Sequence, residues 1–181
     1  MTELVPPDVR LHRSWAEAVA EFEVAGSTQH GYGLWDFQPL DTTEAGCRKA
    51  VDFLLAQADP ATELPDGLVH CTYFWITEDD TFVGYLAMRH SLTPWLLEEG
   101  GHIGYSIRPS RRNEGHASRA LALAVRRARE QLGIDRVLVT CDDDNEASRR
   151  TIERCGGVFE DERQGKLRYW IDTAEDAPEM K

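Results

Sequence analysis

The sequence predicts a single mixed α/β domain, in which helices flank a sheet. Three observations lead to this fold class. The chain has 181 residues, which is enough for one compact core and too few for two substantial ones. Strand-like and helix-like patterns follow one another in the order strand, two helices, three strands, helix, strand, helix, two strands. No repeat, linker or low-complexity tract divides the chain, so one domain is expected over residues 1–181.

The N-terminal part, residues 1–68, is predicted to be mainly helical. The short run Val9–His12 suits a strand. Ser14, followed three residues later by Glu17, has the spacing of a capping box and predicts a helix that begins there. A second apolar stripe predicts a helix over Thr43–Ala58, which a nearby proline ends.

Residues 69–108 are predicted to form three strands. Val69–Thr77 and Thr81–His90 are rich in β-branched and aromatic residues. Three acidic residues separate them, so they are expected to form a hairpin. In His102–Arg108 apolar side chains alternate along the run, which indicates a further strand.

The C-terminal part alternates helices and strands. A helical stripe begins at Ala117 and ends at Gly133. The last residues, 173–181, are polar and are expected to form a frayed tail, so the sheet and its helices should span residues 69–172. The remaining predicted elements are a buried strand at Asp135–Cys141, a helix capped by Asn145, and strands at Val158–Glu160 and Leu167–Ile171.

The net charge argues against two classes of partner. The chain has 20 Lys and Arg against 32 Asp and Glu, which gives a formal net charge of −12. Proteins that bind nucleic acid or an anionic membrane usually present a basic surface, so neither partner is expected. An acidic surface suits a cationic partner, but it more often serves only solubility.

An island of positive charge interrupts this acidity. Seven arginines and a single acid, Glu114, lie between Arg108 and Arg129. A local concentration of arginine in an acidic chain indicates a site for a small polyanion.

The cysteines, at positions 47, 71, 141 and 155, are far apart in the sequence. No pair has the spacing of a zinc site, so no metal site is expected. The chain starts without the basic and apolar regions of a secretory leader, and no segment approaches the roughly 20 apolar residues of a membrane span. Free thiols in a cytoplasmic protein are therefore expected.

The turn Arg112–Ser118 lies between a predicted strand and a predicted helix. Backbone N–H groups of a first helical turn have no partner within the helix, and small residues at Gly115 and Ala117 let a phosphate approach them. The turn has neither the Walker sequence nor the dinucleotide fingerprint. It predicts a pyrophosphate site, with an ordinary capped helix as the alternative.

The turn resembles motif A of the GCN5-related N-acetyltransferase (GNAT) family, Arg/Gln-x-x-Gly-x-Gly/Ala, and here reads Arg112-Asn113-Glu114-Gly115-His116-Ala117. Further along, Asn145-Glu146-Ala147-Ser148 and a helix ending in Gly156-Gly157 resemble motif B. The resemblance covers about Val69–Ile171, and the chain looks most like uncharacterised predicted acetyltransferases of this family. It implies a mixed six- to seven-stranded sheet that is splayed open at the cofactor strand and flanked by about four helices.

The resemblance implies acetyl-CoA as cosubstrate. The pantetheine arm would pair with the backbone around Ile107 and reach Asn145, with Ser148 nearby. Arg112 would lie beside the pyrophosphate, which would be held by the backbone N–H groups of Asn113, Glu114, Gly115, His116, Ala117 and Ser118.

The resemblance also implies that an amine attacks the thioester directly. No covalent enzyme intermediate is needed, so Cys141 and Cys155 are expected in the core. Many members carry on the motif B helix a Tyr that protonates the departing thiolate, but Ile152 stands at that position here. Tyr169 and Tyr105 are the alternatives for this acid, and either could instead be a core aromatic.

Two residues before or at the cofactor strand, Glu99 and His102, are the candidates for the base. A structural histidine, with water chains carrying the proton, is the alternative. Residues 1–68 occupy the variable acceptor region of the family. There Tyr32, Trp35 and Asp36 could hold an amine by cation–π contact and a carboxylate, or could anchor a loop in the core.

The sequence therefore predicts an N-acetyltransferase whose acceptor is a small-molecule or peptide amine. The loss of the usual Tyr leaves a second hypothesis, a catalytically degenerate member that binds CoA as a sensor or interaction module. A homodimer is left open.

Overall fold

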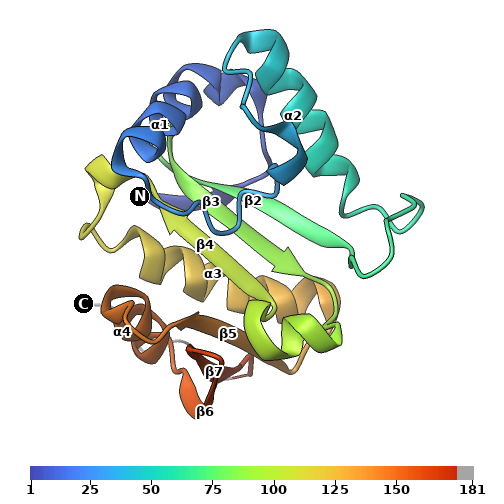
Figure 1. Cartoon of the computed structure of the whole chain (residues 1–181), viewed down its shortest axis with the longest axis vertical. Coiled ribbons are helices and arrows are strands. Elements are labelled where there is room, and N and C mark those ends of the chain that lie inside the picture. The colour runs from blue at the N-terminus through green and yellow to red at the C-terminus, as the bar shows by residue number, and fades with distance from the viewer. Residues whose placement is uncertain (175–181) are drawn as a thin grey trace.

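Seven strands in two sheets and four α-helices make up the described part of the chain, residues 1–174, in a computed structural model (Figure 1). The predicted order of elements is confirmed. The elements are β1 (Thr2–Val5), α1 (His12–Ala25), α2 (Glu44–Ala56), β2 (Cys71–Glu78), β3 (Thr81–Arg89), β4 (Ile103–Ile107), α3 (His116–Leu132), β5 (Arg136–Asp142), α4 (Glu146–Arg154), β6 (Val158–Arg163) and β7 (Lys166–Asp172).

The sheets separate between β4 and β5. The first sheet has the strand order β1-β2-β3-β4 and the second β5-β7-β6, with antiparallel pairing throughout. β4 and β5 come together where the backbone N–H of His102 donates to the Leu138 carbonyl at 2.7 Å. Figure 1 shows the two strands running apart from each other. The predicted sheet with an opening at this strand is therefore confirmed.

Two hydrophobic clusters support the first sheet from its two faces. One lies against α3 and contains Leu86, Ile103 and Leu121, and it continues to the second sheet. The other lies under α1 and α2 and contains Trp15 and Trp75. The helices before β2 and the helix after β4 thus cover opposite faces of the first sheet. They leave one edge of β4 uncovered.

The first strand lies earlier than predicted. Thr2–Val5 pairs with β2, whereas Val9–Leu11 forms a 3-10 turn, η1. The Asp8 side chain caps this turn by accepting a hydrogen bond from the Arg10 N–H. Because the Asp8 side chain caps the short run Val9–Leu11, that run forms a turn and not a strand.

Ser14 lies inside α1 and does not cap it, which corrects the predicted capping box. Its hydroxyl donates to the Leu11 carbonyl at 3.1 Å and accepts from the Phe82 N–H at 3.0 Å. A contact with β3, which local spacing does not reveal, thus takes the hydroxyl. Thr43 does cap α2, by accepting from the Gly46 N–H at 3.1 Å.

Residue 173, the first of the predicted tail, belongs to the packed fold. Thr173 is buried, and its hydroxyl donates to the carbonyls of Ile134 and Asp135 at 2.7 and 2.9 Å. Residues 175–181 of the predicted tail lie outside the described part of the chain. Within residues 1–174, no helix has the length and apolar character needed to cross a membrane.

Candidate functional site

The separation of the sheets exposes one edge of β4. Two hydrogen bonds set the phase of the β3–β4 ladder: the Arg89 N–H donates to His102 at 2.8 Å, and the Arg108 N–H donates to Val83 at 2.9 Å. Backbone groups alternate between the two edges of a strand, so those of residues 103, 105 and 107 point into the opening. An extended ligand with amide groups can pair there as an added strand.

His102 closes the narrow end of this opening. Besides the backbone bond to Leu138, its ring Nδ1 accepts from the Leu138 N–H at 2.9 Å. Burial, with a smaller effect of the Arg89 charge, lowers the pKa of His102 to about 4. Because the lone pair on Nδ1 is engaged in joining the sheets, the geometry argues against the predicted role of His102 as a base.

The turn after β4 presents a row of unused backbone N–H groups. α3 begins after Gly115, which has a φ of +82° and supplies no side-chain cap. Among the described residues, no hydrogen-bond partner is found for the backbone N–H groups of residues 113–118. Together with the positive end of the α3 dipole, these groups are suited to bind an anion. The left-handed backbone at Gly115 favours glycine, and a Cβ there would lie 3.2 Å from the Arg119 guanidinium.

Most of the arginine island serves the fold, which corrects the expectation that it gathers around a polyanion. The buried Arg108 pairs with Glu21 of α1, and Arg127 lies 4.8 Å over the Phe74 ring. Arg112 is different, because its Nε donates at 3.1 Å to the carbonyl of Ile107, on the β4 edge that faces the opening. Arg112, the arginine predicted beside the pyrophosphate, therefore borders the opening.

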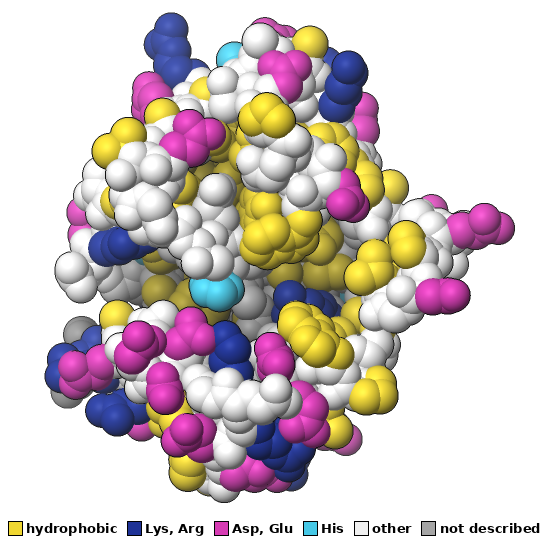
Figure 2. Space-filling view, viewed as in Figure 1, with side chains coloured by type: hydrophobic (Ala, Val, Ile, Leu, Met, Phe, Trp, Pro, Cys, Tyr) yellow, Lys and Arg dark blue, Asp and Glu magenta, His cyan; other side chains and the backbone are white. Residues whose placement is uncertain are grey.

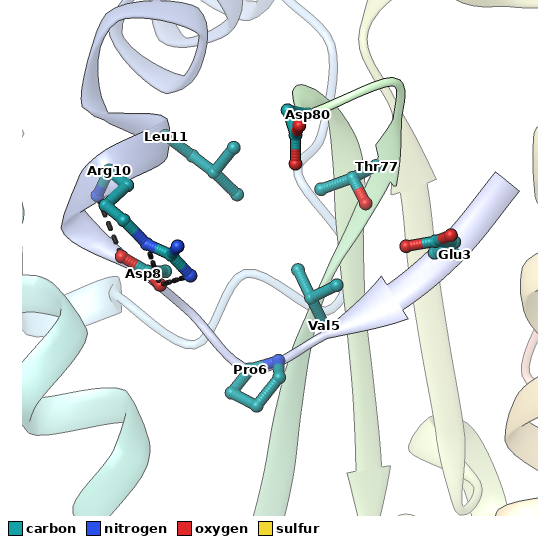
Figure 3. A pocket seen from close by; sticks show the side chains of 8 residues that line it. All are labelled: Glu3, Val5, Pro6, Asp8, Arg10, Leu11, Thr77 and Asp80. Carbon is teal, nitrogen blue, oxygen red and sulfur yellow. Dashed lines mark hydrogen bonds and ion pairs between the residues drawn. The ribbon is translucent and has the colours of Figure 1, made fainter. Parts of the chain in front are cut away.

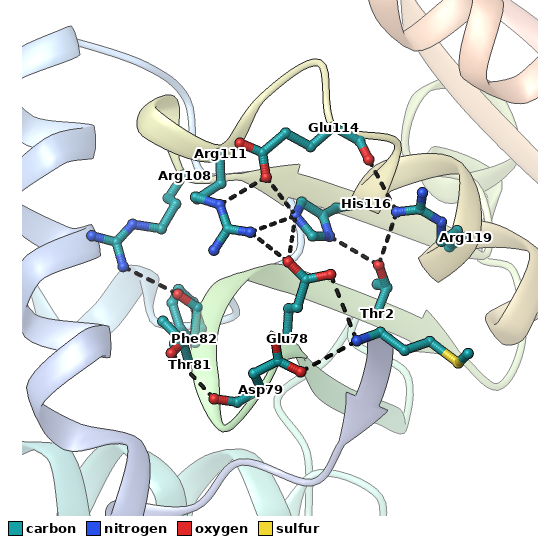
Figure 4. A network of polar contacts seen from close by, with 11 residues as sticks. Thr2, Glu78, Asp79, Thr81, Phe82, Arg108, Arg111, Glu114, His116 and Arg119 are labelled. Carbon is teal, nitrogen blue, oxygen red and sulfur yellow. Dashed lines mark hydrogen bonds and ion pairs between the residues drawn. The ribbon is translucent and has the colours of Figure 1, made fainter.

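Arg111 and His116 anchor the turn to the far side of the first sheet (Figure 4). Arg111 donates to Glu78 at 2.6 Å and to Glu114 at 2.8 Å. The ring of His116 is buried, with Nδ1 2.9 Å from the Thr2 hydroxyl and Nε2 3.1 Å from Glu114. The side chains of Glu114 and His116 are thus engaged, and their backbone N–H groups remain for a phosphate.

This network also brings three metal-ligating side chains together. Ligand atoms of Glu78, Glu114 and His116 lie within 4.8 Å of one another. The Arg111 guanidinium already binds both carboxylates and supplies the positive charge there. The cluster is therefore explained as an anchor of the turn.

Two hydroxyl groups meet across the opening between β4 and α4. The Tyr105 hydroxyl lies 2.9 Å from that of Ser148. Asn145 caps α4, as predicted, by accepting from the Ser148 N–H at 3.1 Å. Burial raises the pKa of Tyr105, so its hydroxyl keeps its proton at neutral pH. Ile152, further along α4, is fully buried in the core.

Tyr169 and Glu99 are engaged elsewhere. The Tyr169 hydroxyl donates to the Glu153 carboxylate at 3.0 Å, and burial raises its pKa to about 12. Glu99 lies in the π-helical turn Leu96–Gly100 before β4, where its carbonyl accepts from the Thr140 hydroxyl. The structure therefore does not bring Tyr169 and Glu99 together with Tyr105 and Ser148 in one contact.

The segment between α1 and α2 carries the predicted acceptor residues. Tyr32 is buried and anchors the segment, whereas Trp35 is 64% exposed and packs edge-on against the Tyr32 ring at 4.5 Å. Asp36 is exposed beside it. Figure 2 shows a hollow between the N-terminal helices and the second sheet, with apolar side chains along its upper edge and a histidine at its rim.

Two further residues of this segment contact β4, and the sequence did not single them out. The His30 carbonyl accepts from the Ser106 hydroxyl at 2.8 Å. Gly31 has a φ of +79°, and a Cβ there would lie 2.4 Å from the Gly104 carbonyl oxygen. The pair of glycines around Tyr32 was the available signal, because glycine in a loop marks close backbone contacts.

Comparison with known proteins decides the family. A family model described as an acetyltransferase (GNAT) domain matches residues 10–158, most of the chain. The chain belongs to the GNAT acetyltransferase family. Acetyl-CoA is the donor that this family uses. A comparison with curated proteins finds no match.

Solved structures share the GNAT fold. MccE, a microcin self-immunity acetyltransferase in complex with acetyl-CoA and AMP, has a TM-score of 0.66 at 13% identity over 94% of this chain and 92% of that chain. RimJ of Mycobacterium smegmatis, with a CoA disulfide, has a TM-score of 0.70 at 19% identity over 97% and 85%. RimL, a ribosomal alpha-N-protein acetyltransferase with coenzyme A, has a TM-score of 0.59 at 22% identity over 98% and 96%.

A pocket of about 490 Å³ lies elsewhere on this GNAT domain (Figure 3). It is lined by residues of β1, η1 and the β2–β3 hairpin, at the edge of the first sheet opposite β4. Asp8 and Arg10 pair with each other at its wall at 2.6 Å. The pocket borders none of the features of the opening.

Proposed function

We propose that this chain is an N-acetyltransferase that moves the acetyl group of acetyl-CoA to a primary amine by direct attack. One observation carries the proposal: three features border a single opening. They are the turn whose backbone N–H groups have no partner among the described residues, the edge of β4 that faces away from β3, and the Tyr105–Ser148 hydroxyl pair. They suit a pyrophosphate, an amide-bearing arm and a leaving thiolate in that order.

The cofactor would be held mainly by backbone groups. Residues 113–118 would bind the pyrophosphate through their N–H groups, with Arg112 beside it, and the backbone around Ile107 would pair with the pantetheine arm. Asn145 and Ser148 would face that arm from α4. Acetyl-CoA supplies an acetyl group activated as a thioester.

The reaction needs a polarised carbonyl, an acid for the thiolate and a base for the amine. Backbone N–H groups of β4 that point into the opening can polarise the carbonyl. We favour Tyr105 over Tyr169 as the acid, because the Tyr105 hydroxyl borders the opening and the Tyr169 hydroxyl donates to Glu153. Direct attack is supported by the cysteines, because all four are buried and burial raises the pKa of each to about 11.

The acceptor would enter over the segment between α1 and α2. Trp35 and Asp36 offer an exposed aromatic face and a carboxylate, which suit an ammonium group. The name of the structural neighbour RimL, an alpha-N-protein acetyltransferase, supports a peptide amine beside a small-molecule amine as the acceptor. Net negative charge would favour the approach of either.

Two measurements test the proposal. Isothermal titration should show acetyl-CoA binding, and release of CoA thiol should depend on one member of a panel of antibiotics, polyamines, amino acids and peptides. Absence of binding at high micromolar acetyl-CoA would refute the proposal. Binding without turnover on any amine would instead support a CoA sensor, the hypothesis that Ile152 at the usual Tyr position keeps open.

A further inference from the structure

The backbone at His30 is fixed on the acceptor side of β4. The carbonyl of His30 accepts from Ser106, and the next residue, Gly31, lies directly against β4 and β3. A Cβ at Gly31 would be 2.4 Å from the Gly104 carbonyl oxygen and 3.0 Å from the Ala87 nitrogen. This contact holds the His30 backbone over the middle of β4.

That position adjoins the reacting end of the proposed path. Tyr105 lies in the sequence between the two β4 residues that the His30–Gly31 segment contacts. Its backbone groups point into the opening, and its hydroxyl meets Ser148. A thioester at Tyr105 would therefore have the His30 segment on its acceptor side and α4 on the other.

The ring of His30 differs from every other histidine ring of the chain. Of the six histidines, residues 12, 70, 90, 102 and 116 each have a ring nitrogen within hydrogen-bond distance of a protein group. Among the described residues, no such partner is found for the ring nitrogens of His30. Its lone pair is thus free to accept a proton.

Charged groups from three strands influence the pKa of this ring. Partial burial lowers the pKa of His30, and the positive charges of Lys166 on β7 and Arg89 on β3 lower it further. The Asp142 carboxylate on β5 raises it. Although His30 is exposed at the surface, the imidazole is therefore largely uncharged at neutral pH. An uncharged, unpartnered imidazole at this place suits a base.

We propose that His30 accepts the proton lost by the acceptor amine, an inference that rests on the proposed N-acetyltransferase function. The amine nitrogen forms the new bond to the acyl carbon, and the carbon–sulfur bond breaks with its electron pair on sulfur. Sulfur takes the Tyr105 proton, and the nitrogen gives its proton to His30. Solvent then carries that proton back to Tyr105, so the net products are the amide and the CoA thiol.

The test compares His30→Gln with His90→Gln. His90 is a matched control, because partial burial also lowers its pKa while its ring is bonded to Thr72 at 2.8 Å. In His30→Gln, kcat at saturating amine should fall about 100-fold, the decline of kcat toward acid pH should disappear, and acetyl-CoA affinity should be unchanged. Wild type and His90→Gln should share one pH profile.

Imidazole rescue gives a second readout. Added imidazole should restore part of kcat in His30→Ala and leave the kcat of wild type unchanged. This comparison tests the role of the His30 ring even if His30→Gln fails to fold. Unchanged kcat with the wild-type pH profile in His30→Gln overturns the inference, and so does a rise in KM alone. If wild type binds acetyl-CoA but acetylates no amine, the proposed function itself is refuted, which is visible without any variant.

Discussion

The hydroxyl of Tyr105 on β4 lies 2.9 Å from the hydroxyl of Ser148 on α4. This pair joins the two sides of the opening at the level where β4 presents its unpaired backbone edge. A buried phenol with a raised pKa carries its proton at neutral pH, as a group that is to protonate a departing thiolate must. In the proposed mechanism, this pair would supply the acid that Ile152 cannot.

Removing this hydroxyl should slow acetyl transfer. Tyr105→Phe should lower kcat about 100-fold while acetyl-CoA affinity, measured by titration calorimetry, stays unchanged. Tyr169→Phe is the control, and it should cost about 1 kcal/mol of stability through the lost bond to Glu153 and leave kcat intact. A large loss of kcat in Tyr169→Phe and none in Tyr105→Phe would reverse the assignment.

A side chain at Gly115 should block the phosphate site. Gly115→Val places a branched side chain at a φ of +82° and against the Arg119 guanidinium, so acetyl-CoA affinity should fall at least about tenfold. Gly133→Val, at the other end of α3, shares a positive φ of +64° but has open space around it. Both variants should lose about 1 kcal/mol of stability, and Gly133→Val should retain cofactor affinity.

The Glu21–Arg108 pair should make stability depend on acid pH. Bonds from Arg108 and from Ser110 lower the pKa of Glu21 from 4.5 to about 2. A carboxylate with a lowered folded-state pKa stabilises the fold fully above its unfolded pKa, and this contribution is lost as pH falls from about 4.5 to about 2.

Urea unfolding of Glu21→Gln measures this contribution. The variant should lose on the order of 2 kcal/mol at pH 7, and the difference from wild type should shrink below about pH 4.5. Glu23→Gln, an exposed neighbour on α1, should show no such dependence. A difference between Glu21→Gln and wild type that stays constant down to pH 3 would contradict the assignment.

The thiols should be unreactive in the native protein. The four cysteines are buried, and burial raises the pKa of each to about 11, so little thiolate exists at pH 8. A colourimetric disulfide reagent should titrate four thiols in guanidinium and react only slowly without it. Rapid native reaction with loss of activity, prevented by acetyl-CoA, would instead indicate a catalytic cysteine.

Local sequence patterns determined the order of elements, the α3 stripe and the cap at Asn145, because helix and strand periodicity and caps depend on near neighbours. They failed at the first strand. The first strand is Thr2–Val5, and it forms because it pairs with β2, about 70 residues later in the chain. Ser14 failed for the same reason, since its partner is Phe82.

Composition showed an arginine island but could not assign its members. Arg108 turns to Glu21 and Arg111 to Glu78, while Arg112 borders the opening. Adjacent arginines in a turn point in different directions, so their roles depend on which distant carboxylates the fold brings near. Tertiary structure decided this, as it decided that the lone pair of His102 is engaged and that of His30 is free.

The sequence by itself thus determined the fold class, the family and the turn that is proposed to bind phosphate, because glycine, caps and apolar periodicity act over a few residues. Only the tertiary structure decided which phenol, imidazole and guanidinium border the opening. Those choices depend on contacts between residues far apart in the chain, such as Tyr105 with Ser148 and His30 with Ser106.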